Sequence, residues 1–488
     1  MHPVRSSPVT DHDPVPASWE TGTIVLLPSL SFPVAELAKI TGIDHYEERL
    51  LCAILLLRRT DLRIVYLTSQ PVDPAVVDYH LGFLPDPGDA RRRLHLVAVG
   101  ESGPRPLTHK LLDHPEVLAR VRELVHDDAS AALLPFNVTP AEWTLAGALG
   151  LPVDGPRADL VALGSKSGSR RVARRAGVAF LDGEEDLGSV VEVAAAVERL
   201  RGRRPDLLGA VVKLNHGFSG QGNALVDLTV AVPLAEPFTT FCAGGESWPS
   251  FSAKIVADGA IVEEMAPGPL ASPSAQVRIN SDGGVHVVST HDQVLGGPGA
   301  QVYLGCRFPA DAAYRRTIAE AALAVGRVLA ADGVVGPFGI DFLVLAGANG
   351  AGPSVVLSEI NLRLGGTTHP FWMARLATGG RYDPASGQLM VGSRPRCYVA
   401  TDNLRASGLA GWSPAEAIEA VAAAGLAFDA STGTGTTLHL LGALARHGKM
   451  GATCIAEDLV GAEAQFEAVA TLLAGVAGVD QGAGRPSS

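Results

Sequence analysis

Cysteine is scarce in this sequence, and the few cysteines follow no recognisable spacing. The 488 residues include five cysteines, and no two of them form a Cys-x-x-Cys pair. An odd number of scattered cysteines argues against a disulfide framework and against a zinc ribbon. This usage is typical of a protein that works in the reducing cytoplasm.

A basic surplus and long apolar runs are also missing. The formal net charge is −12 and the sequence pI is about 5.6, which argues against a nucleic-acid partner. The N-terminus has no apolar core segment, so it is not expected to be a signal peptide. The longest apolar runs, such as 50–57, are too short to span a membrane. We therefore expect a cytoplasmic protein with no membrane partner.

Apolar residues make up 47% of the chain, enough for the cores of two to four domains. Residues 1–20 are rich in Pro, Ser and Asp, and we expect them to be disordered. Strand-like and helix-like patterns then alternate through 21–155, which predicts a doubly wound parallel sheet. Strands are expected at 23–27, 63–68, 94–99 and 131–135, and helices at 44–59, 73–81, 115–126 and 139–149. The 44–59 helix is expected to be amphipathic. No Gly-x-Gly-x-x-Gly motif follows the first strand, so a dinucleotide site is not supported.

The middle region, 156–385, reads as α+β. Helices are expected at 165–176, 185–201 and 309–331, between strands joined by turns. Ala257-Asp258-Gly259 and Ser281-Asp282-Gly283-Gly284 both have the composition of hairpin turns. A small α+β domain is expected at 386–476. Its strands are expected at 396–401, 436–441 and 449–455, and its helices from Pro414 and at 458–474. We expect the tail, 477–488, to be disordered.

Polar residues alternate along one apolar strand of the middle region. Glu359, Asn361 and Arg363 occupy every second position, so an extended backbone directs all three to one face. Asp341 interrupts another apolar run and could bring a second carboxylate beside them. Two carboxylates and an amide oxygen suit Mg²⁺, and the Arg363 guanidinium suits phosphate or carboxylate oxygens. The alternative is an ordinary strand with a salt-bridged polar face.

A glycine-rich loop follows the strand expected at 208–214, which carries Lys213. Glycines let backbone N–H groups approach phosphate oxygens, although a simple turn would have the same composition. The residues of this loop that we select as nucleotide contacts are Gly217, Ser219, Gly220, Gln221 and Gly222. Lys166 lies in a basic stretch that could equally be a solvated helix face. Glu263, Glu264 and Met265 end a strand before Pro267-Gly268, where they could contact an adenine or simply close the strand.

The linear order of these motifs resembles that of the ATP-grasp superfamily. The order runs from Lys166 through Lys213 and its loop, Glu263 and Asp341 to Ser-Glu-Ile-Asn-Leu-Arg at 358–363. The whole layout is most similar to the pheganomycin-type peptide ligases. That resemblance implies a pre-ATP-grasp domain at 21–155, a smaller lobe at about 177–265, a core lobe at about 266–385 and a small C-terminal domain. Two departures are Leu362, where the family often has Pro, and Glu264, where it often has Lys.

The resemblance implies an ATP-dependent carboxylate–amine ligase that forms a peptide bond through an acyl phosphate and releases ADP and phosphate. Lys166 and Lys213 would bind the α- and β-phosphates, and the 217–222 loop would cover the β- and γ-phosphates. Glu263 and nearby backbone would hold adenine. Asp341, Glu359 and Asn361 would hold one or two Mg²⁺ ions, which Mn²⁺ could replace. Arg363 would stabilise the oxyanion, so Arg363 and Lys213 are the catalytic candidates.

The substrates implied by the resemblance are an amino acid-like carboxylate and the N-terminal amine of a peptide, in natural-product or antibiotic biosynthesis. Arg278, Arg307 and His369 flank the core motifs and are candidate substrate contacts, with surface ion pairs or turn positions as the alternative. Two other functions remain open: an ATP-grasp enzyme that uses a thiol acceptor or only transfers phosphate, and a nucleotide-binding module without turnover. Self-association into a homo-oligomer also remains open.

Overall fold

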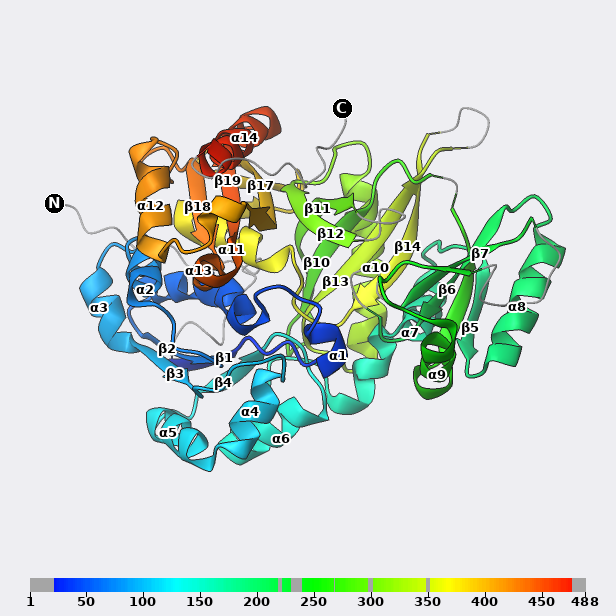
Figure 1. Ribbon diagram of the computed structural model, residues 1–488, viewed down its shortest axis with the longest axis horizontal. Helices are drawn as coiled ribbons and strands as arrows, with labels where there is room; N and C mark the ends of the chain where they lie inside the picture. Colours follow the sequence, from blue (N-terminus) through cyan, green and yellow to red (C-terminus); the bar gives the residue numbers. More distant parts are fainter. Residues whose placement is uncertain are drawn as a thin grey trace.

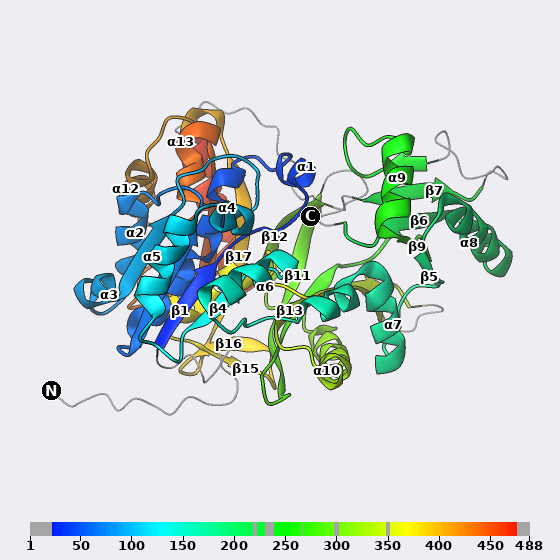
Figure 2. The same cartoon turned by 90° about the horizontal axis from the view of Figure 1, so that it is seen from below.

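The computed structural model describes residues 22–217, 222–229, 239–266, 268–296, 302–347 and 352–475. In Figure 1 the N-terminal domain and the C-terminal part of the chain lie together on the left, and a long sheet occupies the centre. The small lobe lies on the right. Figure 2 shows the same arrangement from below, with the small lobe set apart from the parallel sheet.

Four parallel strands in the order β3-β2-β1-β4 form the N-terminal domain. Ile24 and Leu26 of β1 pack into one core, and Val25 and Leu27 pack into another on the opposite face. Helices therefore cover both faces, and the predicted doubly wound sheet is confirmed. The elements are β1 (Gly22–Leu27), α1 (Val34–Leu37), the 3₁₀ helix η2 (Ile43–Arg58), β2 (Leu62–Thr68), α2 (Pro74–Leu81), α3 (Pro87–Arg93), β3 (Leu94–Ala98), α4 (Leu107–Asp113), α5 (Pro115–Val125), β4 (Ala132–Pro135) and α6 (Pro140–Leu149).

The helix predicted as amphipathic is η2, and it has no solvent-exposed face in its central part. Residues 47–57 are all buried, including Glu47, Glu48 and Arg49. The parallel sheet covers one side of η2, and segments near the C-terminus cover the other, where the Gly442 amide donates to Glu48 Oε2 at 2.9 Å. The amphipathic prediction is wrong because this second cover comes from residues almost four hundred positions away.

The central sheet combines the core lobe with the C-terminal part of the chain. Its main path is β14-β13-β10-β11-β12-β17-β16-β15, and β19 and β18 continue from β17. The core-lobe elements are η3 (Ala158–Gly164), α7 (Lys166–Ala176), β10 (Pro273–Ile279), β11 (Val285–Gly296), β12 (Val302–Phe308), α10 (Arg315–Ala331), β13 (Gly336–Leu345), β14 (Ser354–Asn361) and α11 (Thr368–Thr378). The C-terminal elements are β15 (Arg381–Asp383), β16 (Gln388–Val391), β17 (Arg394–Arg405), η7 (Ser407–Leu409), α12 (Pro414–Ala423), β18 (Gly435–His439), η8 (Leu441–Ala443), α13 (Leu444–His447), β19 (Lys449–Ala456) and α14 (Leu459–Gly475).

The small lobe is an antiparallel sheet covered by helices on one face. Its strand order is β5-β9-β6-β7-β8. The elements are β5 (Gly183–Leu187), α8 (Val190–Arg203), β6 (Gly209–Leu214), β7 (Asn223–Asp227), β8 (Thr239–Phe241), α9 (Trp248–Asp258) and β9 (Ala260–Glu264). The first residues of the helix predicted at 185–201 therefore belong to β5.

Of the two predicted hairpin turns, one is confirmed and one is wrong. Gly283, with a φ of +84°, turns the chain between the antiparallel strands β10 and β11. Gly259 instead ends α9, and its amide donates to the carbonyl of Ile255. The Asp-Gly pair is the same in both places, but the residues before Asp258 continue a helix.

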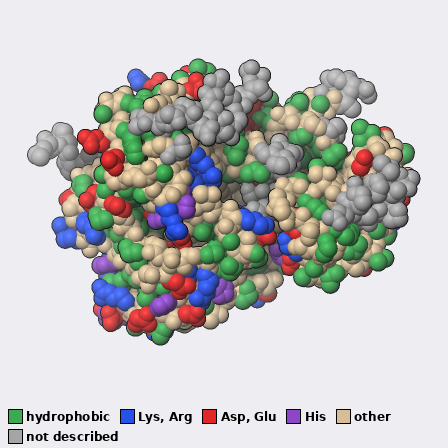
Figure 3. Space-filling model, viewed as in Figure 1, with side chains coloured by type: hydrophobic (Ala, Val, Ile, Leu, Met, Phe, Trp, Pro, Cys, Tyr) green, Lys and Arg blue, Asp and Glu red, His purple; other side chains and the backbone are tan. Residues whose placement is uncertain are grey.

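Among the described residues, no helix is both long and apolar enough to cross a membrane. On the face drawn in Figure 3, acidic and basic side chains are interspersed over the N-terminal domain.

Gly305 marks the junction between the core lobe and the C-terminal strands, where β12 pairs with β17. A Cβ added to Gly305 would overlap the carbonyl oxygen of Ala400. We expect Gly305→Ala to force these strands apart and to lower the free energy of unfolding by about 1–3 kcal/mol, as overpacking does. Urea denaturation checks this. Gly352→Ala is the matched control, because a Cβ there meets nothing within 4 Å. Equal stability of the two variants would contradict the prediction.

Candidate functional site

Two carboxylates face each other across the strand pair β13 and β14. In the antiparallel register Asp341 lies opposite Glu359, and Gly339 lies opposite Asn361, so all these positions share one face. Ile340 and Ile360 alternate with them and are fully buried in the core beneath α10. The alternation predicted from the sequence therefore places the acidic residues on the face away from α10.

Lys166 joins the two lobes at these carboxylates. Its Nζ donates to Glu359 Oε1 at 2.5 Å and to the carbonyl of Gly217 at 3.1 Å. Ser165 caps α7, which begins at Lys166, and the amide of Ser167 donates to Asn215 Oδ1. The ammonium group is thus held between β14 of the core lobe and the loop that follows β6.

Among the described residues, Asp341 has no cationic side chain as a hydrogen-bond partner. Its carboxylate accepts from Gln293 Nε2 at 2.5 Å and from Asn361 Nδ2 at 2.9 Å. Burial and the neighbouring Glu359 carboxylate raise the pKa of Asp341 to about 6. A divalent cation between the two carboxylates would relieve this repulsion, so this donor set fits Mg²⁺.

Asn361 and Arg363 continue the polar face, but Asn361 is not oriented as a metal ligand. Arg363 Nη2 donates to Asn361 Oδ1 at 2.8 Å, and the guanidinium lies 5.5 Å from the centre of the Phe32 ring. The amide nitrogen of Asn361, not its oxygen, therefore faces Asp341. For Asn361 to ligate an ion beside Asp341, its amide must turn over and release the Arg363 hydrogen bond.

Lys213 and Glu263 form an ion pair on one face of the small-lobe sheet. Val211 lies opposite Glu263 in the register, and Lys213 lies two positions further on the same face. Val212 and Val262 point to the other face, into the core beneath α8 and α9. Burial of the valines therefore fixes the side on which Lys213 and Glu263 lie.

Glu264 does not share that side. Its carboxylate pairs with Arg204 Nη1 at 2.6 Å and accepts from the backbone N–H of Asp182 at 3.2 Å. The next residue along a strand points to the opposite face, which removes the Glu264 side chain from the Lys213 side. Glu264 therefore stays a predicted nucleotide contact through its backbone, while its side chain points away from the Lys213 side. Met265, at the end of β9, is 37% exposed, and its amide donates to the carbonyl of Gly209.

The two ends of the glycine-rich loop lie close together. The amide of Leu214 donates to the carbonyl of Gly222 at 2.9 Å, and Gly222 has a φ of +89° that favours glycine. Gly217 contacts Lys166 through its carbonyl. Ser219, Gly220 and Gln221 lie outside the described residues.

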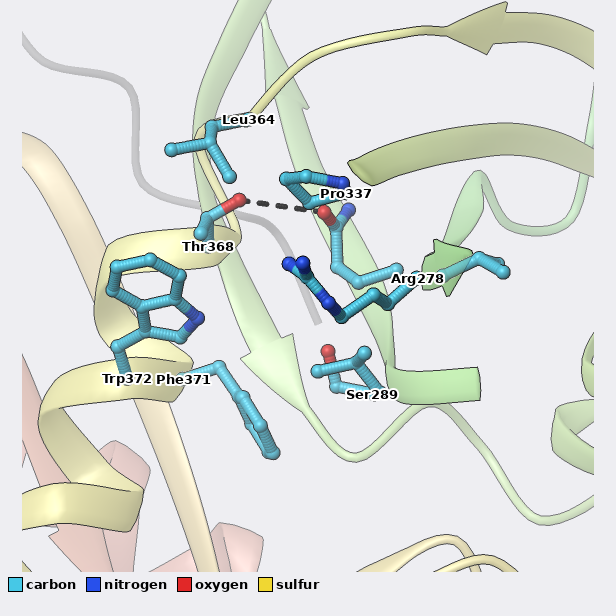
Figure 4. Close-up of a pocket in the computed structure, with 10 residues that line it drawn as sticks. Arg278, Ser289, Pro337, Leu364, Thr368, Phe371 and Trp372 are labelled. Atoms are coloured by element: carbon cyan, nitrogen blue, oxygen red, sulfur yellow. Dashed lines mark hydrogen bonds between the residues drawn. The ribbon is translucent and has the colours of Figure 1, made fainter. Parts of the chain in front are cut away.

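The three predicted substrate contacts do not gather at the acidic pair. Figure 4 shows Arg278 in a pocket between the sheet and α11, near Ser289, Phe371 and Trp372. The Arg278 guanidinium is paired with Asp154 at 2.6 Å and is buried, so it is not a free cation for a substrate.

Arg307 and His369 also contact other side chains, away from the acidic pair. Arg307 pairs with Glu463 at 2.8 Å, and the register places it on the face of the sheet opposite Asp341. His369 is 3% exposed and contacts Asp402. In all three cases the partner is distant in sequence, and no local pattern indicates it.

Two residues at the site were not predicted. Gln293 of β11 donates to Asp341, and Arg170 of α7 lies 3.7 Å from the Glu263 carboxylate. Strand pairing places Gln293 at the site, and helix packing places Arg170 there. Neither residue belongs to a sequence motif with a characteristic spacing, so the sequence alone did not indicate them.

Three family models match this chain. The model described as "Pre ATP-grasp domain" matches residues 52–151, the one described as "IQCH-like, ATP-grasp" matches 235–385, and the one described as "PGM1 C-terminal domain" matches 416–468. An L-propargylglycine–L-glutamate ligase from Streptantibioticus cattleyicolor is 34% identical over 466 residues, which span 93% of this chain and 94% of that protein. The chain belongs to this family of ATP-grasp carboxylate–amine ligases. The resemblance drawn from the order of the motifs is thereby confirmed.

Solved structures show the same fold. Biotin carboxylase from Campylobacter jejuni, in a beta-gamma-ATP complex, is 15% identical with a TM-score of 0.56, and the match covers 92% of this chain and 90% of that one. N5-carboxyaminoimidazole ribonucleotide synthetase from Thermus thermophilus is 16% identical with a TM-score of 0.52, covering 94% and 99%. The fold class predicted from the sequence is confirmed, and this ligase joins a carboxylate to an amine at the expense of ATP.

Lys213 offers a direct test of the nucleotide side of the site. A charge-assisted phosphate contact is worth about 1.5–3 kcal/mol, so Lys213→Ala should raise the ATP concentration needed for half-maximal rate about 10-fold or more. Steady-state kinetics with varied ATP measure this. Arg204→Ala is the matched control, because it breaks the ion pair with Glu264 on the opposite face of the same sheet. An unchanged ATP requirement in Lys213→Ala would show that this face does not bind phosphate.

Proposed function

We propose that this ligase activates an amino acid-like carboxylate as an acyl phosphate and joins it to the free amine of an amino acid or peptide, releasing ADP and phosphate. The observation that carries the proposal is the pair of carboxylates Asp341 and Glu359, facing Lys166 at the junction of the two lobes. Transfer of a phosphoryl group needs acidic residues that hold a metal ion and a basic residue that binds phosphate oxygens. Asp341 and Glu359 are suited to the first role and Lys166 to the second.

The nucleotide would lie between the lobes, along the face that carries Lys213. Lys166 and Lys213 are each paired with a carboxylate, and a phosphate would replace Glu359 and Glu263 as their counter-ions. Glu263 and the backbone at residues 264–265 would then be free to hold the adenine end. The loop from Gly217 to Gly222 begins beside Lys166 and would cover the distal phosphates.

Asp341 and Glu359 would hold one or two Mg²⁺ ions, with Asn361 as a third ligand after its amide turns over, and Mn²⁺ has the same preference for such oxygens. The ion would supply positive charge to the β- and γ-phosphate oxygens. Arg363, which lies beside Asn361, would bind the carboxylate being activated and then stabilise the oxyanion formed when the amine attacks.

The acceptor would be held with its amine close to the acyl group, which replaces an encounter in solution by an intramolecular step. The proposed substrates rest on the relative named for ligation of L-propargylglycine to L-glutamate, in which both partners are amino acids. A peptide with a free N-terminus presents the same α-amine. All five cysteines are free and buried, which suits the cytoplasm as the site of this reaction.

The proposed mechanism predicts the nucleotide product. An acyl phosphate leaves ADP and phosphate in amounts equal to the ligated product, whereas an acyl adenylate leaves AMP and pyrophosphate. Amino acids and short peptides are screened as donors and acceptors. Chromatography then identifies the spent nucleotide, and mass spectrometry gives the mass of the ligated product. Stoichiometric AMP would reject the acyl phosphate.

The control for the acceptor is an N-acetylated peptide compared with its free-amine twin. Only the free amine should give ligated product, because the acetyl group removes the nucleophile. Equal product from both peptides would reject the amine acceptor while leaving the nucleotide result intact.

A further inference from the structure

Two histidines and an aspartate meet in a buried cluster away from the acidic pair. His369 belongs to the first turn of α11, Asp402 to β17 and His439 to the end of β18. Their exposed fractions are 3%, 5% and 7%. Within the described part of the chain, this is the one group of His, Cys, Asp and Glu side chains whose donor atoms lie close enough together to share an ion.

The three donor atoms form a nearly equilateral triangle. Asp402 Oδ1 lies 2.9 Å from His369 Nε2 and 2.8 Å from His439 Nε2, and the two Nε2 atoms lie 3.2 Å apart. Hydrogen bonds can satisfy two of these three contacts at most. If both Nε2 atoms carry a proton and donate to Asp402, neither can accept a hydrogen bond from the other. If one Nε2 atom instead accepts from the other histidine, it carries no proton and cannot donate to Asp402.

The surroundings orient the cluster. Arg49 Nη1 donates to Asp402 Oδ2 at 3.3 Å, which leaves Oδ1 turned toward the imidazoles. Gly451 lies opposite His439 in the β18–β19 register, and a Cβ there would overlap His439 Nε2, so a glycine keeps this space open.

We propose that His369, Asp402 and His439 bind one divalent transition-metal ion of the zinc class. Two imidazole nitrogens and one carboxylate oxygen are ligands that such ions prefer. At metal–ligand distances of about 2.0–2.2 Å, the observed separations correspond to angles of about 85–105° at the ion. The three ligands would then occupy one side of the ion, with water on the other.

Such an ion would link three elements beside the segment that follows Arg363. α11 begins five residues after Arg363, and the other two ligands come from the C-terminal strands. The ion would therefore hold the segment that follows Arg363 against the C-terminal part. The positive charges of Arg49 and Lys449 lie near Asp402 and weaken the binding of a metal cation. The experiment therefore adds zinc to the protein.

The test measures metal bound by the full-length protein. The protein, without a histidine tag, is incubated with Zn²⁺ in the presence of excess Mg²⁺, which occupies the acidic pair, and is then desalted. Elemental analysis should find about one zinc per chain in the wild type and in Glu359→Gln, and much less in His439→Gln. His291→Gln is the matched control: His291 is fully buried but contacts Tyr398, and it should leave the zinc content unchanged.

A second measurement uses only the wild type and so does not depend on whether a variant folds. Zn²⁺ should raise its melting temperature and a chelator should reverse the shift, because an ion that binds only the folded state stabilises it. A third measurement compares the two proteins: with Co²⁺ in place of Zn²⁺, the wild type should show visible absorption that His439→Gln lacks. The proposal is overturned if the wild type neither retains zinc nor shifts its melting temperature, or if Glu359→Gln loses the zinc that His439→Gln keeps.

Discussion

The antiparallel register of β13 and β14 sets Asp341 opposite Glu359, and the arrangement of the site depends on this pairing. Two like charges on neighbouring strands repel each other, and burial together with this repulsion raises the pKa of Asp341. The repulsion persists because Ile340 and Ile360 bury the other face of both strands. A core thus holds two carboxylates where they would otherwise separate, which prepares them for a shared cation.

Lys166 connects this pairing to the small lobe. Its ammonium contacts Glu359 on β14, while the start of its helix is hydrogen-bonded to the loop after β6. Lys213 and Glu263 repeat the same arrangement within the small lobe, with a buried cation paired to a buried carboxylate. Each lysine has a carboxylate partner that a phosphate can replace, so binding of a nucleotide exchanges one set of charge pairs for another.

The sequence was sufficient wherever short-range periodicity decides the outcome. The alternation of Glu359 and Asn361 predicted their shared face. The order of the whole set of motifs, from Lys166 to Arg363, predicted the family. It was insufficient where a distant partner decides. Arg278 forms a buried ion pair with Asp154, which lies 124 positions away in the sequence. The segment that covers the second side of η2 includes Gly442, far along the chain. The sequence also did not show which of two adjacent glutamates faces Lys213. Glu263 and Glu264 point to opposite faces of their strand, and the packing of Val262 decides that Glu263 faces Lys213.

The most direct test of the central claim is a Mg²⁺ titration of ligation by Glu359→Gln. If Asp341 and Glu359 share the ion that carries the phosphates, the loss of one anionic ligand should raise the Mg²⁺ requirement at least about 10-fold and cripple turnover, since even one charge-assisted contact is worth about 1.5–3 kcal/mol. Glu264→Gln, on the other face of the small-lobe sheet, should behave like the wild type. Near-normal turnover of a folded Glu359→Gln at ordinary Mg²⁺ would contradict the account.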